Sequence, residues 1–120
     1  MELVALVSSG KGTWGQVAGL VKRGEWEKVY LVCPNYVKQR IKTFDFAQKA
    51  ELFFFDFDKK MKDVIAEMNK KFKNKIQGPE VSLTIASGTG KEHMALISSL
   101  LKLPVGVRFV VLTSEGILEL

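Results

Sequence analysis

The sequence predicts an α/β fold, with a doubly wound, mostly parallel sheet of six strands that ends in a β-hairpin. Short apolar runs alternate with segments whose apolar residues recur at helical spacing. Four such strand–helix pairs follow one another, which is typical of a parallel sheet with helices on both faces. The last two apolar runs are separated only by a turn, which indicates a hairpin. The 120 residues contain no linker and no internal repeat, so we expect a single domain over residues 1–120.

Six apolar runs supply the strands. Most are short and nearly continuous, as expected of strands that are buried on both faces of a sheet. Residues 52–57 also carry several aromatic side chains, which favour strands. Residues 113–116 form the turn of the hairpin, so the last strand should run antiparallel to the fifth. The expected strands cover residues 3–7, 29–33, 52–57, 81–86, 107–112 and 117–120.

Four helices are expected between these strands. Gly24 ends the first helix, and Gly78 followed by Pro79 ends the third. Asp58 is expected to cap the N-terminus of the third helix. The fourth helix, residues 91–102, is apolar around most of its circumference and should be buried on more than one side. The residues at helical spacing are Trp14, Val17, Ala18 and Val21 in the first helix, Val37, Ile41 and Phe44 in the second, and Met61, Val64, Ile65, Met68 and Phe72 in the third.

Composition narrows the chemistry that the chain can perform. The net charge of +5 favours an anionic partner such as a nucleotide, a phosphate or a nucleic acid. Cys33 is the only cysteine, which excludes an internal disulfide and favours a reducing compartment. With a single histidine, His93, a zinc site within one chain is not expected, and the carboxylates of Asp56 and Asp58 alone make a poor magnesium site. We therefore expect no metal and no cofactor.

The sequence also bears on where the protein works. No apolar run reaches the roughly 18 residues that a membrane span needs. The first residues lead directly into a strand, without a basic flank or a cleavage site. We therefore expect a cytoplasmic protein without an export signal and without a membrane partner.

A first glycine-rich segment follows the first strand. It reads Ser8-Ser9-Gly10-Lys11-Gly12-Thr13-Trp14-Gly15, and its glycines have the G-x-G-x-x-G spacing of a dinucleotide-binding fingerprint. Glycines in this place let backbone amides approach a phosphate at the helix N-terminus. The fingerprint also needs an acidic residue at the end of the second strand, where this chain has Cys33-Pro34-Asn35. The alternative is a tight turn with a capping box between Thr13 and Gln16.

A second glycine-rich segment follows the fourth strand and reads Ser87-Gly88-Thr89-Gly90-Lys91-Glu92-His93-Met94. It is no Walker A motif, because Ile85 and Glu92 stand where that motif needs glycine and Ser or Thr. Its hydroxyls, small residues and single lysine at a helix N-terminus still predict an anion site. The alternative is a capping box between Thr89 and Glu92, although Lys91 opposes the helix dipole unless an anion compensates it.

The two segments are expected to converge. In a sheet with strand order 3-2-1-4-5, the first and fourth strands are neighbours and their helices lie on opposite faces. Ligands of such sheets bind at this point, outside the carboxyl ends of the strands. Both glycine-rich segments begin there, so the sequence predicts one crevice between them.

These residues resemble a known family. A strand ending in Ser87-Gly88-Thr89-Gly90-Lys91, followed by a helix with Met94, a fifth strand and a hairpin, resembles the CRISPR-associated Rossmann fold (CARF) domain. That family typically has a Thr-Gly-Gly-Thr-Lys-x-Met segment here. In this chain a Gly and a Thr are exchanged, and one extra residue lies between Lys91 and Met94. The resemblance covers nearly the whole chain in element order, but its specific part is these eight residues.

The resemblance implies a Rossmann-like homodimer that binds a cyclic oligoadenylate, usually the tetra-adenylate, across its two-fold axis in CRISPR-linked antiviral signalling. Most members carry a C-terminal effector, and because the chain reaches Leu120 without one, we expect a stand-alone member. Such relatives can cleave the ring without a metal, by driving a ribose 2′-hydroxyl in line onto the adjacent phosphate. Whether this chain is such a ring nuclease or only binds stays open.

The resemblance also assigns roles to residues. Lys91 and Lys11 would be the catalytic residues, because they would stabilise the charge that grows on the phosphorane. His93 would act as an acid or base, or would lie on the helix surface. Trp14 would stack on adenine, or would pack in the core or in the dimer interface. The ligand-binding residues would be Ser9, Gly10, Lys11, Gly12, Thr13, Ser87, Gly88, Thr89, Gly90, Lys91 and His93.

Two other classes of function compete with this one. The first is a nucleotide- or dinucleotide-binding protein, which the G-x-G-x-x-G spacing favours. The second is a basic module that binds nucleic acid through the many lysines of residues 59–75. Because Asp63 and Glu67 are interleaved with these lysines, we expect a solvated face with ion pairs there rather than a stripe that binds nucleic acid.

Overall fold

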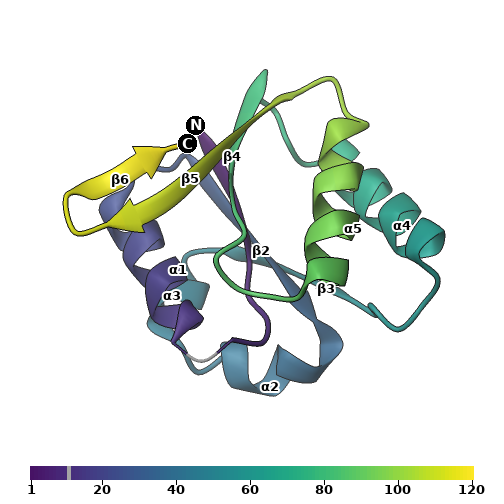
Figure 1. The fold of residues 1–120 in the computed structure, drawn as a ribbon, viewed down its shortest axis with the longest axis horizontal. Coiled ribbons are helices and arrows are strands. Elements are labelled where there is room, and N and C mark those ends of the chain that lie inside the picture. Colours follow the sequence, from purple (N-terminus) through teal and green to yellow (C-terminus); the bar gives the residue numbers. More distant parts are fainter. Residues whose placement is uncertain (11) are drawn as a thin grey trace.

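The computed structural model describes residues 1–10 and 12–120. One six-stranded sheet runs through the molecule in the order β3-β2-β1-β4-β5-β6 (Figure 1). The strands are β1 (Glu2–Leu6), β2 (Lys28–Pro34), β3 (Glu51–Phe55), β4 (Glu80–Thr84), β5 (Gly106–Thr113) and β6 (Gly116–Glu119). All neighbouring strands are parallel except β5 and β6, which form an antiparallel hairpin. The α/β class, the strand order and the C-terminal hairpin are therefore confirmed, and the sheet is Rossmann-like.

The helices lie in the crossovers that the sequence predicts. They are α1 (Thr13–Arg23), α2 (Lys38–Ile41), α3 (Asp45–Gln48), α4 (Met61–Lys73) and α5 (Gly90–Leu101), with a 3₁₀ turn η1 (Asn35–Val37) before α2. None of the helices in the described ranges combines the length and the apolar character that crossing a membrane requires.

The crossover after β2 is more broken than predicted. Phe44, expected on the second helix, lies beyond α2 in extended backbone, and the single turn of α3 follows it. Thr43 contributes to the break. Its hydroxyl donates to the carbonyl of Arg40 at 2.8 Å and so competes with the backbone hydrogen bonds that would continue the helix.

The predicted cap of α4 was wrong. The N-cap residue is Lys60, and no side chain caps this end among the described residues. Asp58 instead donates its amide to Oδ1 of Asp56 at 3.0 Å. This Asx turn directs the chain away from β3, and it moves the start of α4 to Met61, two residues later than a cap at Asp58 would place it.

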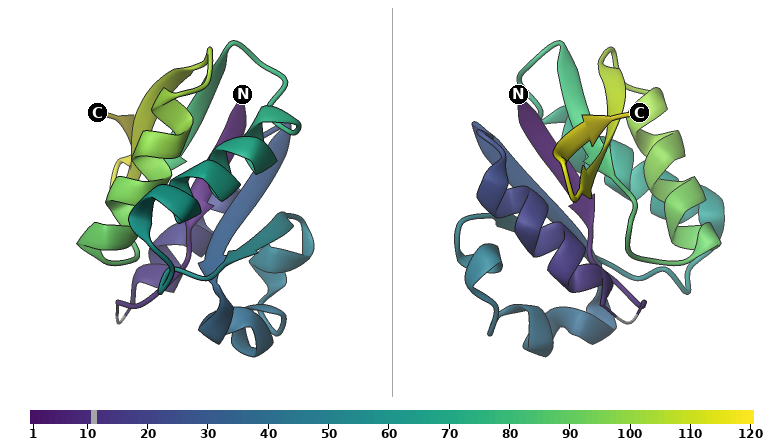
Figure 2. Two further views of the ribbon diagram at one scale, coloured as in Figure 1. Left: turned by 90° about the vertical axis from the view of Figure 1, so that its right-hand side faces the viewer. Right: turned by 60° about the vertical axis from the view of Figure 1, so that its left-hand side comes forward.

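Two apolar cores cover the two faces of the sheet. Side chains alternate along β1, so that Leu3 and Ala5 contact the core under α1, whereas Val4 and Leu6 contact the core under α4 and α5. Figure 2 shows α4 and α5 in front of the sheet in one view and α1 in front of it in the other. The helices that follow the neighbouring strands β1 and β4 therefore lie on opposite faces of the sheet, and both begin beyond the carboxyl ends of these two strands.

Cys33 lies in the core under α1 with no exposed surface. Burial raises the pKa of its thiol to about 12. We predict that iodoacetamide at pH 8 labels the native protein at least about a hundredfold more slowly than the protein in urea, because only the thiolate reacts. Mass spectrometry over a time course measures both rates. Rates within a few-fold of each other would show that the thiol is accessible in the native state.

Candidate functional site

The two glycine-rich segments meet at the carboxyl ends of β1 and β4. These strands pair in parallel up to Ala5 and Thr84. Just beyond them, the amide of Gly88 donates to the carbonyl of Ser9 at 2.9 Å. The amide of Ser8 donates to Oγ of Ser87 at 2.9 Å, and this hydroxyl donates to the carbonyl of Ser9 at 3.3 Å. The predicted convergence of the two segments is therefore found in the structure.

Ser87 connects the segments from the inside. Its side chain is fully buried, and its hydroxyl is used both as a donor and as an acceptor. His93 lies on the first turns of α5, half-buried, with Nε2 at 2.9 Å from the carbonyl of Ser87. Because a carbonyl only accepts, Nε2 carries the hydrogen of this bond. Ser87 therefore joins the two loops from their buried side, whereas His93 is partly accessible to solvent beside them.

The N-terminus of α5 has a complete capping box. Thr89 is the N-cap residue; its Oγ1 accepts from the amide of Glu92 at 3.3 Å, and its own amide donates to Oε1 of Glu92 at 2.9 Å. Glu92 is only 5% exposed, and its second oxygen accepts from Oγ of Ser8 at 2.8 Å. The alternative prediction of a capping box here is thus confirmed. Glu92 therefore supplies, from within the chain, the negative charge that stabilises this helix end and offsets the unfavourable position of Lys91 in the first turn.

The N-terminus of α1 is different. Gly12 is the N-cap residue, with a left-handed backbone (φ 81°), and among the described residues no side chain caps this end and no acidic residue lies in the first turn. The alternative prediction of a capping box between Thr13 and Gln16 was wrong. Thr13 is already helical and donates its hydroxyl to the carbonyl of Gly10 at 2.7 Å, while Oε1 of Gln16 accepts from the amide of Leu112 on β5 at 2.9 Å. The end of α1 therefore keeps its positive potential without a carboxylate.

The remaining predicted site residues lie around these two helix ends. Ser9, Gly10, Gly12 and Gly90 are exposed, and Thr13 is half-buried. Lys11, one of the two predicted catalytic lysines, lies outside the described residues.

Trp14 belongs to the core. It is 7% exposed, and its indole N–H donates to the carbonyl of Ser8 at 2.7 Å. Phe44 contacts the ring edge to face, with centroids 4.9 Å apart, and the guanidinium of Arg40 lies 4.5 Å from the ring centroid. Of the alternatives for Trp14, packing in the core is therefore the one found.

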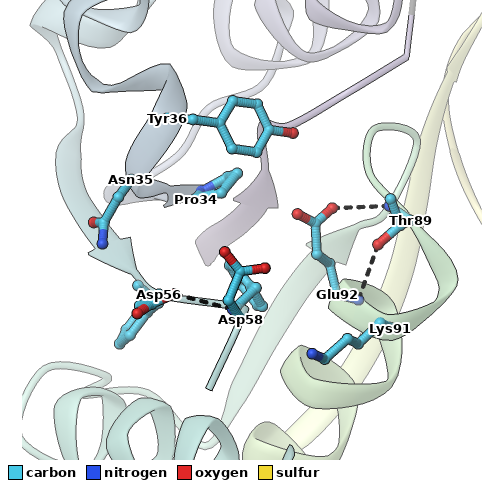
Figure 3. A pocket seen from close by; sticks show the side chains of 10 residues that line it. Pro34, Asn35, Tyr36, Asp56, Asp58, Thr89, Lys91 and Glu92 are labelled. Atoms are coloured by element: carbon cyan, nitrogen blue, oxygen red, sulfur yellow. Dashed lines mark hydrogen bonds between the residues drawn. The ribbon is translucent and has the colours of Figure 1, made fainter. Parts of the chain in front are cut away.

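A pocket of about 580 Å³ lies beside the joined loops, on the face of the sheet that α4 and α5 cover (Figure 3). Within the described residues, three chain segments form it: the end of β2 with the residues after it, the end of β3 with the residues after it, and the start of α5 with its N-cap residue. Its walls are apolar where Pro34, Phe55 and Phe57 lie. Its polar groups come from Asn35, Tyr36, Asp56, Asp58, Thr89, Lys91 and Glu92.

Sequence reasoning missed most of this pocket. Of the predicted site residues that the structure describes, only Thr89 and Lys91 line it, and Asn35 and Tyr36 were not predicted as ligand contacts. The signal that would have found them is their position directly after β2, because the carboxyl ends of β1, β2, β3 and β4 share one edge of the sheet. The same argument applies to Asp58 after β3.

A hydrogen-bonded chain holds one wall of the pocket. The hydroxyl of Ser8 lies 2.8 Å from Oε2 of Glu92 and 3.0 Å from the hydroxyl of Tyr36. Since the carboxylate can only accept, Ser8 donates to Glu92, and Tyr36 donates to Ser8. Tyr36 is thereby fixed at its hydroxyl end although its side chain is 69% exposed.

The remaining sequence predictions concern metal ligands and the lysines around α4. Within the described residues, no three histidine, cysteine, aspartate or glutamate side chains lie together in a way that could hold a metal ion. The lysines around α4 form two of the ion pairs found, Lys59 with Glu67 at 2.7 Å and Lys75 with Glu51 at 3.0 Å.

A scan against protein-family models matched no family, and a search of curated proteins found no significant match.

Gly88 is required by the geometry of the joined loops. Its φ is +108°, and a Cβ there would overlap the side chain of Leu6 and lie 3.0 Å from Oε1 of Glu92. We predict that Gly88→Ala lowers the free energy of unfolding by about 2 kcal/mol or more, measured by urea denaturation. Gly90→Ala is the matched control, because a Cβ at Gly90 meets nothing within 4 Å. Equal midpoints for the two variants would contradict the prediction.

Proposed function

We propose that the chain, as a doubly wound Rossmann-like domain, binds a cyclic oligoadenylate across the two-fold axis of a homodimer, with the tetra-adenylate as the expected ring. One observation carries the proposal. Two glycine-rich loops are hydrogen-bonded to each other at the carboxyl ends of the neighbouring strands β1 and β4, whose helices leave on opposite faces. In open α/β sheets this is where nucleotide ligands bind.

The electrostatics of the two helix ends support an anionic ligand. The end of α1 has no acidic residue in its first turn among the described residues, and Gly12 leaves its backbone open to close approach. Lys91 is exposed on the first turn of α5, beside the same crevice. Phosphates of the ring are therefore expected over the α1 end, with Lys91 beside them. The net charge of +5 strengthens this attraction.

Exposed apolar side chains support a partner copy. On α5, Ala95, Leu96 and Leu100 are buried, but Met94 and Leu101 are 60% and 66% exposed. On β6, Leu118 pairs with Val111 of β5. Because cross-strand partners share a face, and Phe109 two residues before Val111 packs in the α5-side core, Leu118 lies on the same side of the sheet as α5. The sequence predicts that α5 is buried on more than one side. We therefore assign its exposed apolar side to the contact with another copy of the chain.

A mononucleotide or dinucleotide is the alternative ligand, and the pocket of about 580 Å³ within one chain favours it. A dinucleotide is disfavoured by Asn35, which stands after β2 where an acidic residue would hold the ribose. Ring cleavage is a separate question, because the loops and Lys91 fit binding and cutting equally.

The first test is direct titration with cyclic tetra-adenylate. We predict binding by the wild-type protein, no binding of NAD, and a loss of about tenfold or more in affinity for Lys91→Ala, because a charge-assisted contact to phosphate is removed. Lys102→Ala, at the opposite end of α5, is the matched control and should leave the affinity unchanged. Calorimetry gives the affinity, and chromatography of the incubated ligand decides between binding alone and cleavage. Absence of binding by the wild-type protein would contradict the proposal.

The second test concerns the dimer. We predict that Met94→Glu and Leu101→Glu each convert a dimer into monomers in light scattering after size exclusion, because each introduces a charge into an apolar contact. Ala66→Glu is the control, because Ala66 is a small exposed residue on the neighbouring helix α4, and the same charge is introduced there without replacing a large apolar side chain. A wild-type protein that is monomeric, or variants that remain dimeric, would count against this interface.

A further inference from the structure

The pocket beside the joined loops carries a charge opposite to the one that a phosphate needs. Among the described residues, three carboxylates line it, those of Asp56, Asp58 and Glu92, against one ammonium group, that of Lys91. A phosphate inside this pocket would lie among like charges, which repel it strongly where water is partly excluded. The pocket is therefore matched to a part of the ligand that is uncharged and donates hydrogen bonds.

The walls of the pocket suit a flat, apolar group. Pro34, Phe55 and Phe57 form its apolar part. The side chain of Tyr36 is 69% exposed, yet its hydroxyl is tied to Ser8 at 3.0 Å. An exposed aromatic ring that is held in place loses little conformational entropy when a ligand stacks on it. The size of the pocket lies within the range of about 300–1,000 Å³ that is usual for small-molecule sites.

The acceptors in the pocket lie opposite the ring. Figure 3 shows the carboxylate of Asp58 across the hollow from Tyr36, with Glu92 to one side and Lys91 at the edge. Both oxygens of Glu92 already accept hydrogen bonds from Thr89 and Ser8. Asp58 is exposed to solvent, and the hydrogen bond found for it uses its backbone amide. Its carboxylate is thus the acceptor best placed for a ligand.

From this arrangement we infer that the pocket receives the adenine base of the ligand, with the base against Tyr36 and its exocyclic amine donating to the carboxylate of Asp58. The inference rests on the proposed function for the identity of the base. It divides the site into two parts. Phosphates lie over the end of α1 and beside Lys91, and the base enters the acidic pocket between β2, β3 and α5.

Neutralising Asp58 tests this division, because the two possible occupants respond in opposite directions. If an amine donates to the carboxylate, Asp58→Asn weakens the binding of cyclic tetra-adenylate by about tenfold, since a charge-assisted hydrogen bond is replaced by a neutral one. If a phosphate occupies the pocket, the same change removes repulsion and strengthens binding. Asp63→Asn, at an exposed carboxylate on α4, is the matched control and should change nothing. Circular dichroism checks that both variants are folded.

Titration with free nucleosides separates this inference from the proposed function. We expect adenosine, which carries no phosphate, to bind the wild-type protein, and to bind Asp58→Asn and Tyr36→Ala at least tenfold more weakly. Inosine, in which a carbonyl replaces the amine, should also bind at least tenfold more weakly than adenosine. If cyclic tetra-adenylate does not bind but adenosine behaves in this way, the proposed function fails and the base pocket stands.

The opposite results overturn the base pocket while leaving the proposed function intact. One is that Asp58→Asn leaves the binding of cyclic tetra-adenylate unchanged or strengthens it. The other is that the wild-type protein binds adenosine and inosine with equal affinity. Tighter binding of guanosine than of adenosine would also overturn the assignment of adenine.

Discussion

The buried hydrogen bonds around Ser8 and Glu92 are the constraint on which this fold depends. At this point β1 ends, two loops meet, and helices leave for opposite faces of the sheet. Glu92 places a carboxylate, 5% exposed, among donors from Ser8 and Thr89. A buried carboxylate without partners is costly, so each of these groups must keep its position for the others to be satisfied. The loop geometry, the start of α5 and the wall of the pocket all follow from that requirement.

The opposite end of β1 is held by a second carboxylate. Glu2, also 5% exposed, accepts from the hydroxyl of Tyr30 at 3.0 Å and from the amides of Gln77 and Gly78 at 2.9 and 2.8 Å. Burial and the neighbouring Glu2 raise the pKa of Tyr30 well above its ordinary value, so its hydroxyl remains a donor at any physiological pH. The central strand is therefore anchored at both ends by acidic side chains that accept hydrogen bonds from distant segments.

Charge is distributed unevenly at the carboxyl edge of the sheet. The capping box supplies a carboxylate to the end of α5, whereas the end of α1 has none among the described residues. Asp56 and Asp58 add further negative charge on the α5 side. The net charge of +5 for the whole chain gives no indication of this local pattern. The contrast between a positive helix end and an acidic pocket a short way along the same edge gives the two parts of the proposed site different preferences.

The sequence by itself determined the strand order, the hairpin and the convergence of the two glycine-rich loops, and it offered the capping box of Thr89 with Glu92 as one of two alternatives. The hairpin and the capping box depend on residues close in the chain, and the strand order and the convergence of the loops follow from the usual topology of a sheet built from alternating strands and helices. Only the tertiary structure decided that Gln16 contacts Leu112 rather than capping α1, and that Ser8 donates to Glu92. The first pair is 96 residues apart and the second 84. It also decided that Tyr36 and Asp58 share a pocket, because parallel strands bring their carboxyl ends to one edge whatever their distance in sequence. The order of strands in the sequence places these residues at a shared edge of the sheet, but which side chains at that edge line one pocket is decided by packing between segments that are distant in the chain.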